Sequence, residues 1–374
     1  CGEPDTLRRL AKAGADVFRI NFSHGGEDQH GQFLDAVRRV EAEVERPLAV
    51  LADLCGPKIR VGQIQGGSVL LADGQVLAVE REPVVGNAER ISVTVPELVD
   101  SVEAGDSILL DDGKLRLEVV DADGSDRFLC RVARGGILAG GKGVNLPHTK
   151  LAVSAITEKD RRDVEWIAGR EIDYVGLSFV RSPEDVVQLR RLLVEGGCDA
   201  RIVAKVEKPE AVARIDEIIE AADAVMVARG DLGVEMDLPA VPAAQKRIAR
   251  ACQAAGKPCI IATQMLESMT TSATPTRAEV SDVANAVLDF ADSVMLSGET
   301  AVGKHPIAAV HMMNEIVSQV QAYHDETAKP LSIGCAGDPN AAALAAAVRR
   351  ILETEEIAAV AVFTITGGTA LMFA

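Results

Sequence analysis

Two stretches of the chain decide its fold: IVAKVE at 202–207 and VMVARGD at 225–231. Each is an apolar, β-branched run that stops abruptly on charged residues, which is typical of a strand buried on both faces. In chains that alternate strands and helices, chemistry usually takes place where such strands end. Lys205 and Glu207 close the first run, and Arg229, Gly230 and Asp231 close the second. The sequence therefore predicts a site at this rim that binds a metal ion and a phosphorylated anion.

Similar apolar runs recur along the chain with helix-sized spacers between them. The expected strands are 16–23, 47–53, 174–180, 202–207, 224–231, 258–264 and 293–299. The expected helices are 27–44, 157–169, 183–195, 209–221, 240–255, 276–289 and 305–323. This alternation predicts an α/β fold with parallel strands and right-handed crossovers.

Seven expected strands are one fewer than a closed (βα)8 TIM barrel needs. Residues 6–13 predict a helix with no strand in front of it, so we expect a first strand to precede Cys1. An open doubly wound sheet tolerates seven strands and is the structural alternative.

The alternation is interrupted by a segment of short strands divided by turn signals such as Asp73-Gly74 and Asp112-Gly113. This pattern predicts a small antiparallel β module inserted over the active rim as a lid. Near the end of the chain, a helix (340–353) and a strand (357–364) begin a unit too small to bury its own core, so we expect a truncated C-terminal α/β domain. The predicted division is barrel at 1–57 and 147–328, lid at 58–146, and C-terminal domain at 329–374.

Composition limits the classes of function. The chain has 374 residues, 48% of them hydrophobic, and a net charge of −17. That charge argues against nucleic-acid and anionic-membrane partners, which select a cationic surface. The seven cysteines are scattered without a C-x-x-C pair, which favours a reducing compartment, and no apolar run is long enough to span a membrane. We expect a cytoplasmic enzyme.

Nine strings in register carry a resemblance to a known family: RINFSHG (19–25), DLCGPKIR (53–60), KGVNLP (142–147), GLSFVRSPEDV (176–186), IVAKVEKPE (202–210), VMVARGDLGVE (225–235), ATQMLESM (262–269), PTRAEVSDVANAV (275–287) and MLSGETAVGKHP (295–306). In these strings the chain resembles pyruvate kinase. The resemblance implies a TIM barrel with a β-barrel lid and a C-terminal α/β domain. It also implies phosphoryl transfer from phosphoenolpyruvate to ADP and a homotetramer.

The catalytic residues follow from the strand ends and the resemblance together. Glu207 and Asp231 are the expected ligands of Mg²⁺ (or Mn²⁺), which takes few protein carboxylates. Lys205 is expected to stabilise the transferring phosphoryl group and the enolate, and Arg19 to grip the phosphoryl group. Gly230 is expected to let the substrate carboxylate approach the backbone.

The resemblance also places Thr263 near the carbon that is protonated. Because a threonine hydroxyl is a weak acid, we expect it to act in a water relay, together with Ser297 and Glu299.

Two further groups of residues follow from the resemblance. The nucleotide contacts are expected from Arg60, Lys142, Asn21 and His24. The family's monovalent-cation site corresponds to Asn21, Ser23, Asp53 and Leu54. Leu54 stands where potassium-requiring members have threonine, and Lys58 stands where they have glutamate. A tethered ammonium near Asp53 supplies positive charge, so we expect that K⁺ is not required.

Two other functions remain open from the sequence. One is a metal-dependent barrel lyase or aldolase acting on phosphoenolpyruvate or pyruvate, although such enzymes lack the lid insertion. The other is a non-catalytic or disabled fragment of a kinase. The segment TITGGTA at 364–370 matches the family's effector loop, but with little of that domain present we predict no effector.

Overall fold

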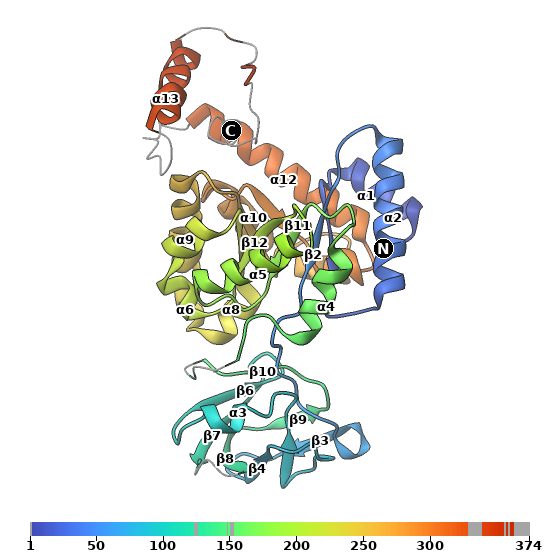
Figure 1. The fold of residues 1–374 in the computed structure, drawn as a ribbon, viewed down its shortest axis with the longest axis vertical. Helices are drawn as coiled ribbons and strands as arrows, with labels where there is room; N and C mark the ends of the chain where they lie inside the picture. Colours follow the sequence, from blue (N-terminus) through green and yellow to red (C-terminus); the bar gives the residue numbers. More distant parts are fainter. Residues whose placement is uncertain are drawn as a thin grey trace.

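The computed structural model of the chain describes residues 2–122, 126–147, 149, 153–327, 339–354, 357 and 360–362. In Figure 1 a ring of alternating strands and helices lies above a separate β module. The chain leaves the ring after β2 (Ala49–Asp53) and returns to it at α4 (Glu158–Ile167).

The ring is built on one parallel sheet with the strand order β1-β2-β11-β12-β13-β14-β15. Besides β2, its strands are β1 (Val17–Asn21), β11 (Tyr174–Leu177), β12 (Arg201–Val206), β13 (Ala224–Ala228), β14 (Cys259–Ala262) and β15 (Ser293–Met295). Every neighbouring pair is parallel. The predicted α/β fold class is therefore confirmed.

Helices cover the outside of this sheet. They are α1 (Pro4–Ala13), α2 (Glu27–Val44), α4, α5 (Pro183–Glu195), α6 (Pro209–Ala213), α7 (Ile215–Ala221), α8 (Arg229–Glu235), α9 (Val241–Ala255), α10 (Arg277–Leu288), α11 (Gly298–Ala301) and α12 (Pro306–Thr327). The expected start signals act as predicted: Thr157 forms a capping box with Asp160, and Pro183 opens α5.

The two faces of the sheet have different partners. Buried residues that point outward join the helices in one large apolar core. A smaller cluster, formed by Leu51, Val203, Ala224, Met226 and Ala262, fills the inside of the ring. Since side chains alternate along a strand, residues two positions beyond Leu51 and Val203 also face inward. Those residues are Asp53 and Lys205, so the polar groups lie on the inner side of the carboxyl ends.

Several expected elements differ from those observed. The strand expected at 293–299 ends at Met295, and Gly298 begins α11. The helix expected at 209–221 is broken at Arg214, whose backbone (φ −109°, ψ 27°) is not helical, so α6 and α7 are separate. The strand expected to run to Asp231 ends at Ala228, and Arg229 begins α8. The apolar run correctly located the strand, but the charged residues after it belong to a helix. Their side chains therefore leave the rim in directions set by a helical turn.

Strands β1 and β15 are the two ends of the sheet order. A cavity of about 510 Å³ lies beside them and is lined by Phe18, Val294, Leu10 and Met313, among others. A further strand between these two edges would have to occupy this space. The expectation of such a strand stays a prediction.

The β module has its own apolar core. It contains a six-stranded sheet, in the order β10-β6-β7-β8-β4-β5, and the pair β3-β9. The strands are β3 (Ser68–Leu71), β4 (Val76–Glu80), β5 (Arg90–Ser92), β6 (Ser107–Leu110), β7 (Leu115–Asp121), β8 (Arg127–Arg134), β9 (Gly136–Ala139) and β10 (Val144–Asn145), with the short helix α3 (Leu98–Ser101). The domain boundaries and the action of this module as a lid remain predictions.

Beyond the ring, the structure describes α13 (Pro339–Thr354), which agrees with the helix expected at 340–353. Half of the strand expected at 357–364, and the whole TITGGTA segment at 364–370, lie outside the described residues; the described residues 357 and 360–362 are not part of a strand. Among the helices that are described, none has both the length and the apolar character that crossing a membrane requires.

Candidate active site

The ammonium group of Lys205 is the centre of the polar cluster at the carboxyl ends of the strands. It lies 3.1 Å from Asp53 Oδ1 and 2.9 Å from Glu207 Oε1, and it donates to Ser178 Oγ at 2.7 Å. Burial opposes the charge of Lys205, but the carboxylates of Asp53 and Glu207 outweigh it and raise the pKa of this ammonium. Lys205 is therefore a buried, permanently charged cation.

Glu207 is held in place by two groups from its surroundings. Besides Lys205, the backbone N–H of Phe179 donates to Glu207 Oε2 at 2.7 Å. Burial raises the pKa of the Glu207 carboxyl; Lys205 opposes that shift, and the negative charge of Asp231 adds to it. Glu207 and Asp231 also line the same cavity of about 90 Å³, so both carboxylates lie at one site. Two such acids that repel each other form a donor set that a divalent cation fits.

Asp53 connects the two cations of the cluster. Arg19 donates to Asp53 Oδ2 at 2.6 Å, and only about 1% of Asp53 is exposed. Burial favours the neutral acid, but Lys205 and Arg19 together lower the pKa of Asp53. Arg19 therefore lies at the rim in a fixed orientation beside Lys205, and its own side chain is only partly buried. Two adjacent cations, one of them reachable, suit an anionic group such as phosphate.

A cavity of about 90 Å³ gathers most of the residues expected at the site. Its walls contain the predicted residues Arg19, Asn21, Ser23, His24, Asp53, Leu54, Lys58, Arg60, Lys205, Glu207 and Asp231. These residues come from widely separated parts of the chain, and the parallel sheet brings their strand ends to one edge.

Comparisons with known proteins agree with this geometry. The family model for the pyruvate kinase barrel domain matches residues 2–310. A pyruvate kinase of Methylorubrum extorquens is 44% identical over 372 residues, which are 99% of this chain and 77% of that protein. The chain belongs to the pyruvate kinase family. Membership makes it a phosphotransferase.

Other pyruvate kinases show the same likeness over different shares of their length. Pyruvate kinase 2 of Synechocystis is 43% identical over 98% of this chain, which spans 62% of that protein. The crystal structure of a pyruvate kinase from Cryptosporidium parvum superposes with a TM-score of 0.88 at 34% identity, covering all of this chain and 78% of that one. This likeness confirms the TIM-barrel fold.

Thr263 and Gly230 lie together at the next strand ends, although neither lines the 90 Å³ cavity. The backbone N–H of Gly230 donates to Thr263 Oγ1 at 2.7 Å, and that hydroxyl donates to Ala262 O at 2.6 Å. A Cβ on residue 230 would stand 3.2 Å from Thr263 Oγ1. Glycine therefore allows the close approach of the threonine, which engages the Gly230 N–H; the expected approach of the substrate carboxylate stays a prediction.

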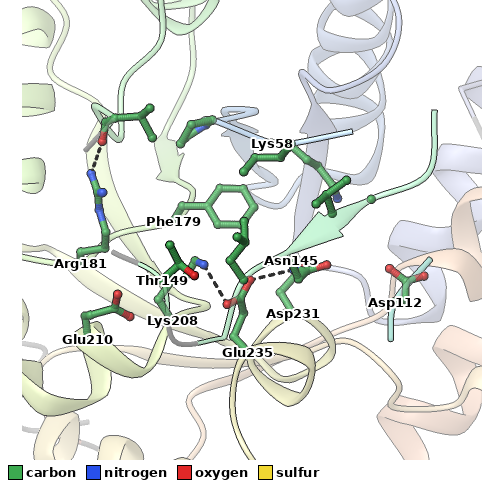
Figure 2. Close-up of a pocket in the computed structure, with 16 residues that line it drawn as sticks. Lys58, Asp112, Asn145, Thr149, Phe179, Arg181, Lys208, Glu210, Asp231 and Glu235 are labelled. Atoms are coloured by element: carbon green, nitrogen blue, oxygen red, sulfur yellow. Dashed lines mark hydrogen bonds and ion pairs between the residues drawn. The ribbon is translucent and has the colours of Figure 1, made fainter. Parts of the chain in front are cut away.

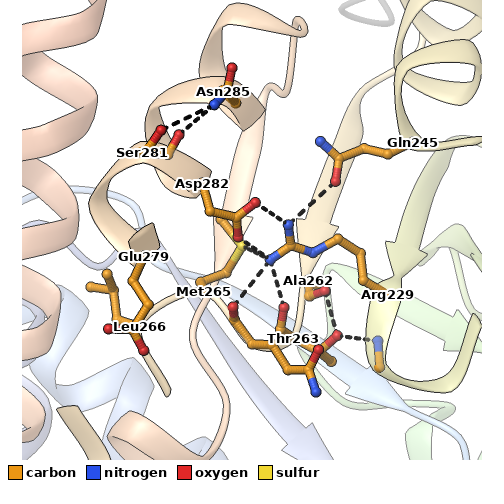
Figure 3. Close-up of polar contacts among 12 residues, drawn as sticks. Arg229, Gln245, Ala262, Thr263, Met265, Leu266, Glu279, Ser281, Asp282 and Asn285 are labelled. Atoms are coloured by element: carbon orange, nitrogen blue, oxygen red, sulfur yellow. Dashed lines mark hydrogen bonds and ion pairs between the residues drawn. The ribbon is translucent and has the colours of Figure 1, made fainter. Parts of the chain in front are cut away.

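The backbone after β14 is strained at the threonine. Thr263 and Gln264 both have positive φ values, 70° and 55°, in the left-handed region that costs a side-chain-bearing residue about 1 kcal/mol or more. Figure 3 shows the guanidinium of Arg229 beside this turn: it donates to Thr263 O at 2.9 Å and pairs with Asp282 of α10 at 2.7 Å. Arg229 thus holds the strained turn in place. The sequence placed Arg229 at the rim but gave no sign of this role.

The residues expected to act with Thr263 are engaged elsewhere. The carboxylate of Glu299 accepts the N–H groups of Leu266 at 3.1 Å and Ser297 at 2.8 Å, so it anchors backbone. Neither contact joins Glu299 or Ser297 to the threonine hydroxyl, so their part in a water relay stays a prediction.

Ser178 is a second residue of the polar cluster that the sequence analysis did not name. Its hydroxyl links Lys205 to Leu54 O, to which it donates at 2.8 Å. The available signal was a serine directly after the apolar run YVGL.

The residues at the family's monovalent-cation site line one cavity. Oxygen atoms of three of them already take part in hydrogen bonds or ion pairs. Asn21 Oδ1 accepts the N–H of Ser23 at 3.0 Å, and Leu54 O accepts the Ser178 hydroxyl. The carboxylate of Asp53 is occupied by Arg19 and Lys205. Lys58 lines the same cavity.

The expected nucleotide residues are only partly assembled. Arg60 lines the cavity, and its guanidinium donates to Gly141 O at 2.9 Å; His24 lines the cavity as well. Lys142 lies in the β module, where it pairs with Asp111 at 2.8 Å, and it does not line the cavity. The backbone of Lys142 nevertheless lies beside Arg60, because Val61 N–H donates to Lys142 O at 2.8 Å and Arg60 forms a bridge with Gly143. The expected nucleotide contact of Lys142 stays a prediction.

Proposed function

We propose that this cavity transfers the phosphoryl group of phosphoenolpyruvate to ADP, giving pyruvate and ATP. In this reaction the bond between the enol oxygen and phosphorus breaks, and a bond forms from phosphorus to a terminal oxygen of ADP. The enolate left behind takes a proton at its methylene carbon. The observation that carries the proposal is the buried Lys205 ammonium, held between Asp53 and Glu207 in a cavity shared with Arg19 and Asp231.

Glu207 and Asp231 are the residues that would hold the family's divalent cation, Mg²⁺ or Mn²⁺. Two carboxylates leave most of an octahedral shell to water and substrate oxygens, which is the usual arrangement for Mg²⁺ at phosphoryl-transfer sites. A divalent cation there neutralises charge on the phosphoryl and enolate oxygens. Lys205 pairs with Glu207, so a divalent cation held there would share that carboxylate with the ammonium.

Lys205 and Arg19 bind and orient the phosphoryl group. Phosphoryl transfer asks a protein mainly for positioning and for neutralisation of negative charge. The ammonium of Lys205 is pre-oriented by Ser178 and two carboxylates, so little reorganisation precedes its interaction with the enolate oxygen. Arg19 is fixed by Asp53 and presents its remaining N–H groups to phosphate oxygens.

Thr263 takes part in delivering the proton to the enolate, through water. Its hydroxyl is oriented by Gly230 N–H and Ala262 O, and the turn that carries it is held by Arg229. The substrate carboxylate is expected to contact the backbone beside Gly230 and Asp231.

The nucleotide is expected to contact Arg60, His24 and Asn21 at the mouth of the cavity. Lys142 joins them only if it leaves Asp111, which requires a movement of the β module or of its own side chain. Such a movement would also exclude water from the phosphoryl group.

The charge on Lys58 supports activity without K⁺. The ammonium of Lys58 lines the same cavity as Asp53 and supplies positive charge there. In other members of the family, a bound K⁺ is expected to supply that charge.

Two further features belong to the proposal. Assembly as a homotetramer rests on family membership, and a cytoplasmic location rests on the scattered cysteines, which favour a reducing compartment. Light scattering of the purified protein tests the first, and fractionation of cells tests the second.

The deciding experiment is a coupled assay of pyruvate formation from phosphoenolpyruvate and ADP with Mg²⁺. We expect turnover by the chain and its loss in Lys205→Met. Equal rates for the two proteins would show that Lys205 is wrongly assigned. A folded chain without turnover, and without thermal stabilisation by Mg²⁺ and ADP, would show that it is a disabled relative.

A further inference from the structure

A second polar cluster lies between the ring and the β module, beside the active cavity. It lines a cavity of about 40 Å³ that shares Lys58, Phe179 and Asp231 with the active cavity. Figure 2 shows Lys208 and Asn145 pointing from opposite sides toward the carboxylate of Glu235. Lys208 Nζ lies 2.8 Å from Glu235 Oε2, and Asn145 Nδ2 donates to Glu235 Oε1 at 2.8 Å.

This ion pair is buried more completely than is usual for charged residues. About 1% of Glu235 and 9% of Lys208 is exposed. Removing two charges from water costs several kcal/mol each, and a buried pair of this kind often stabilises a protein no better than apolar residues would. A gain in stability therefore does not explain why charges occupy this position. A requirement for a defined geometry does.

The pair joins the two chain segments that carry the candidate metal ligands. Lys208 directly follows Glu207. Glu235 ends α8, four residues after Asp231 in its first turn, so the two acids lie on one side of a seven-residue helix. The Lys208–Glu235 contact thus ties the end of β12 to α8. Asn145, in β10, adds the β module to the same contact.

We propose that Glu235 is a positioning residue that sets the spacing of Glu207 and Asp231, and thereby the affinity of the site for its divalent cation. The inference rests on the proposed function, because it takes those two carboxylates as the metal ligands. Glu235 acts through Lys208 and α8 and does not itself touch the ion or the substrate.

The test measures binding of Mn²⁺ without turnover, from the electron paramagnetic resonance signal of free Mn²⁺. In Glu235→Gln the amide still accepts the hydrogen bond of Asn145, but it no longer pairs with the Lys208 ammonium. Loss of a residue that orients a metal ligand typically weakens metal binding about 10- to 100-fold. We expect a weakening of that size in Glu235→Gln, with a smaller loss of kcat at saturating metal.

A second variant covers the outcome that Glu235→Gln does not fold. Lys208→Met combined with Glu235→Leu removes both charges and leaves no buried charge unpaired. We expect this double variant to fold and still to bind Mn²⁺ more weakly. The matched control is Asp223→Asn. Asp223 is a partly buried acid paired with Arg190 at 3.1 Å, and it directly precedes β13, at the opposite end of the strands from the cavity. Its loss should leave Mn²⁺ binding unchanged.

The outcomes separate the two levels of the argument. The positioning role would be overturned if Glu235→Gln or the folded double variant bound Mn²⁺ with wild-type affinity. The metal site would still stand if Glu207→Gln and Asp231→Asn abolished binding. Wild-type affinity in Glu207→Gln and Asp231→Asn would overturn the metal assignment itself. Equal weakening in Asp223→Asn would show a general effect of lost buried charge and would also overturn the positioning role.

Discussion

Replacing Lys205 with methionine is expected to make the stability of the protein depend on pH in a defined direction. The ammonium lies within about 3.1 Å of both the Asp53 and the Glu207 carboxylates, each about 1% exposed. After its removal Asp53 keeps Arg19, but Glu207 keeps only the N–H of Phe179. Breaking a buried pair by removing one partner typically costs about 3–5 kcal/mol, because the other charge stays buried.

The sign of the pH dependence follows from Glu207. Burial and Asp231 already raise its pKa against the opposing effect of Lys205, so without Lys205 its folded-state pKa rises further above the unfolded value. Below the unfolded pKa the carboxyl is protonated in both states and costs nothing. The cost grows as the pH rises through the window between the two pKa values and is complete above the folded pKa. The variant should therefore be closest to the wild type in acid.

Urea unfolding at pH 5 and pH 8 measures this difference. We expect Lys205→Met to lower the free energy of unfolding more at pH 8 than at pH 5, with the full loss of about 3–5 kcal/mol only at the higher pH. Lys246→Met, which removes a partly exposed lysine from the acid Asp289, is the matched control and should cost about 1 kcal/mol or less. An equal loss at both pH values, or a larger loss in acid, would refute the placement of Glu207 beside Lys205.

Three other results are expected. The wild-type rate should be equal in tetramethylammonium and potassium salts, whereas KCl should raise the rate of Lys58→Glu at least about tenfold. Strong KCl activation of the wild type would contradict the role of Lys58. Gly230→Ala, whose Cβ would stand 3.2 Å from Thr263 Oγ1, should raise KM for phosphoenolpyruvate about tenfold while Mn²⁺ binding changes little. Thr263→Val should slow proton exchange into pyruvate about 10²-fold, with Thr263→Ser close to the wild type; equal exchange rates in both variants would exclude the hydroxyl.

The strand ends could be predicted because buried parallel strands leave a strong local signal. IVAKVE and VMVARGD are apolar on both faces until they reach charged residues, and β12 and β13 lie at those positions. Lys205 and Glu207 could also be placed on one side of the chain, since they are two residues apart in extended geometry, and their side chains do meet at 2.9 Å. Local periodicity carried both inferences.

The contacts between segments could not be predicted in this way. Nothing near Asp53 in the sequence shows that it accepts hydrogen bonds from both Arg19 and Lys205, residues 34 and 152 positions away. Arg229 was recognised as a charge at a strand end, but its hold on the turn at Thr263 depends on β13 and β14 being neighbours. Lys142 was expected at the nucleotide, yet the structure pairs it with Asp111 because the β module has its own local partners.

By itself, the sequence determined the α/β alternation, the strand ends that carry the reactive groups, and the family to which the chain belongs. These are properties of short segments, where the period of apolar residues and a few consecutive side chains suffice. Only the tertiary structure decided which charges neutralise which. It buried Lys205 between two acids and joined Glu207 to Asp231 through the contact of Lys208 with Glu235. The physical reason is that burial and electrostatic energy depend on distances through space. Those distances are set only when the parallel sheet brings the carboxyl ends of its strands to one edge.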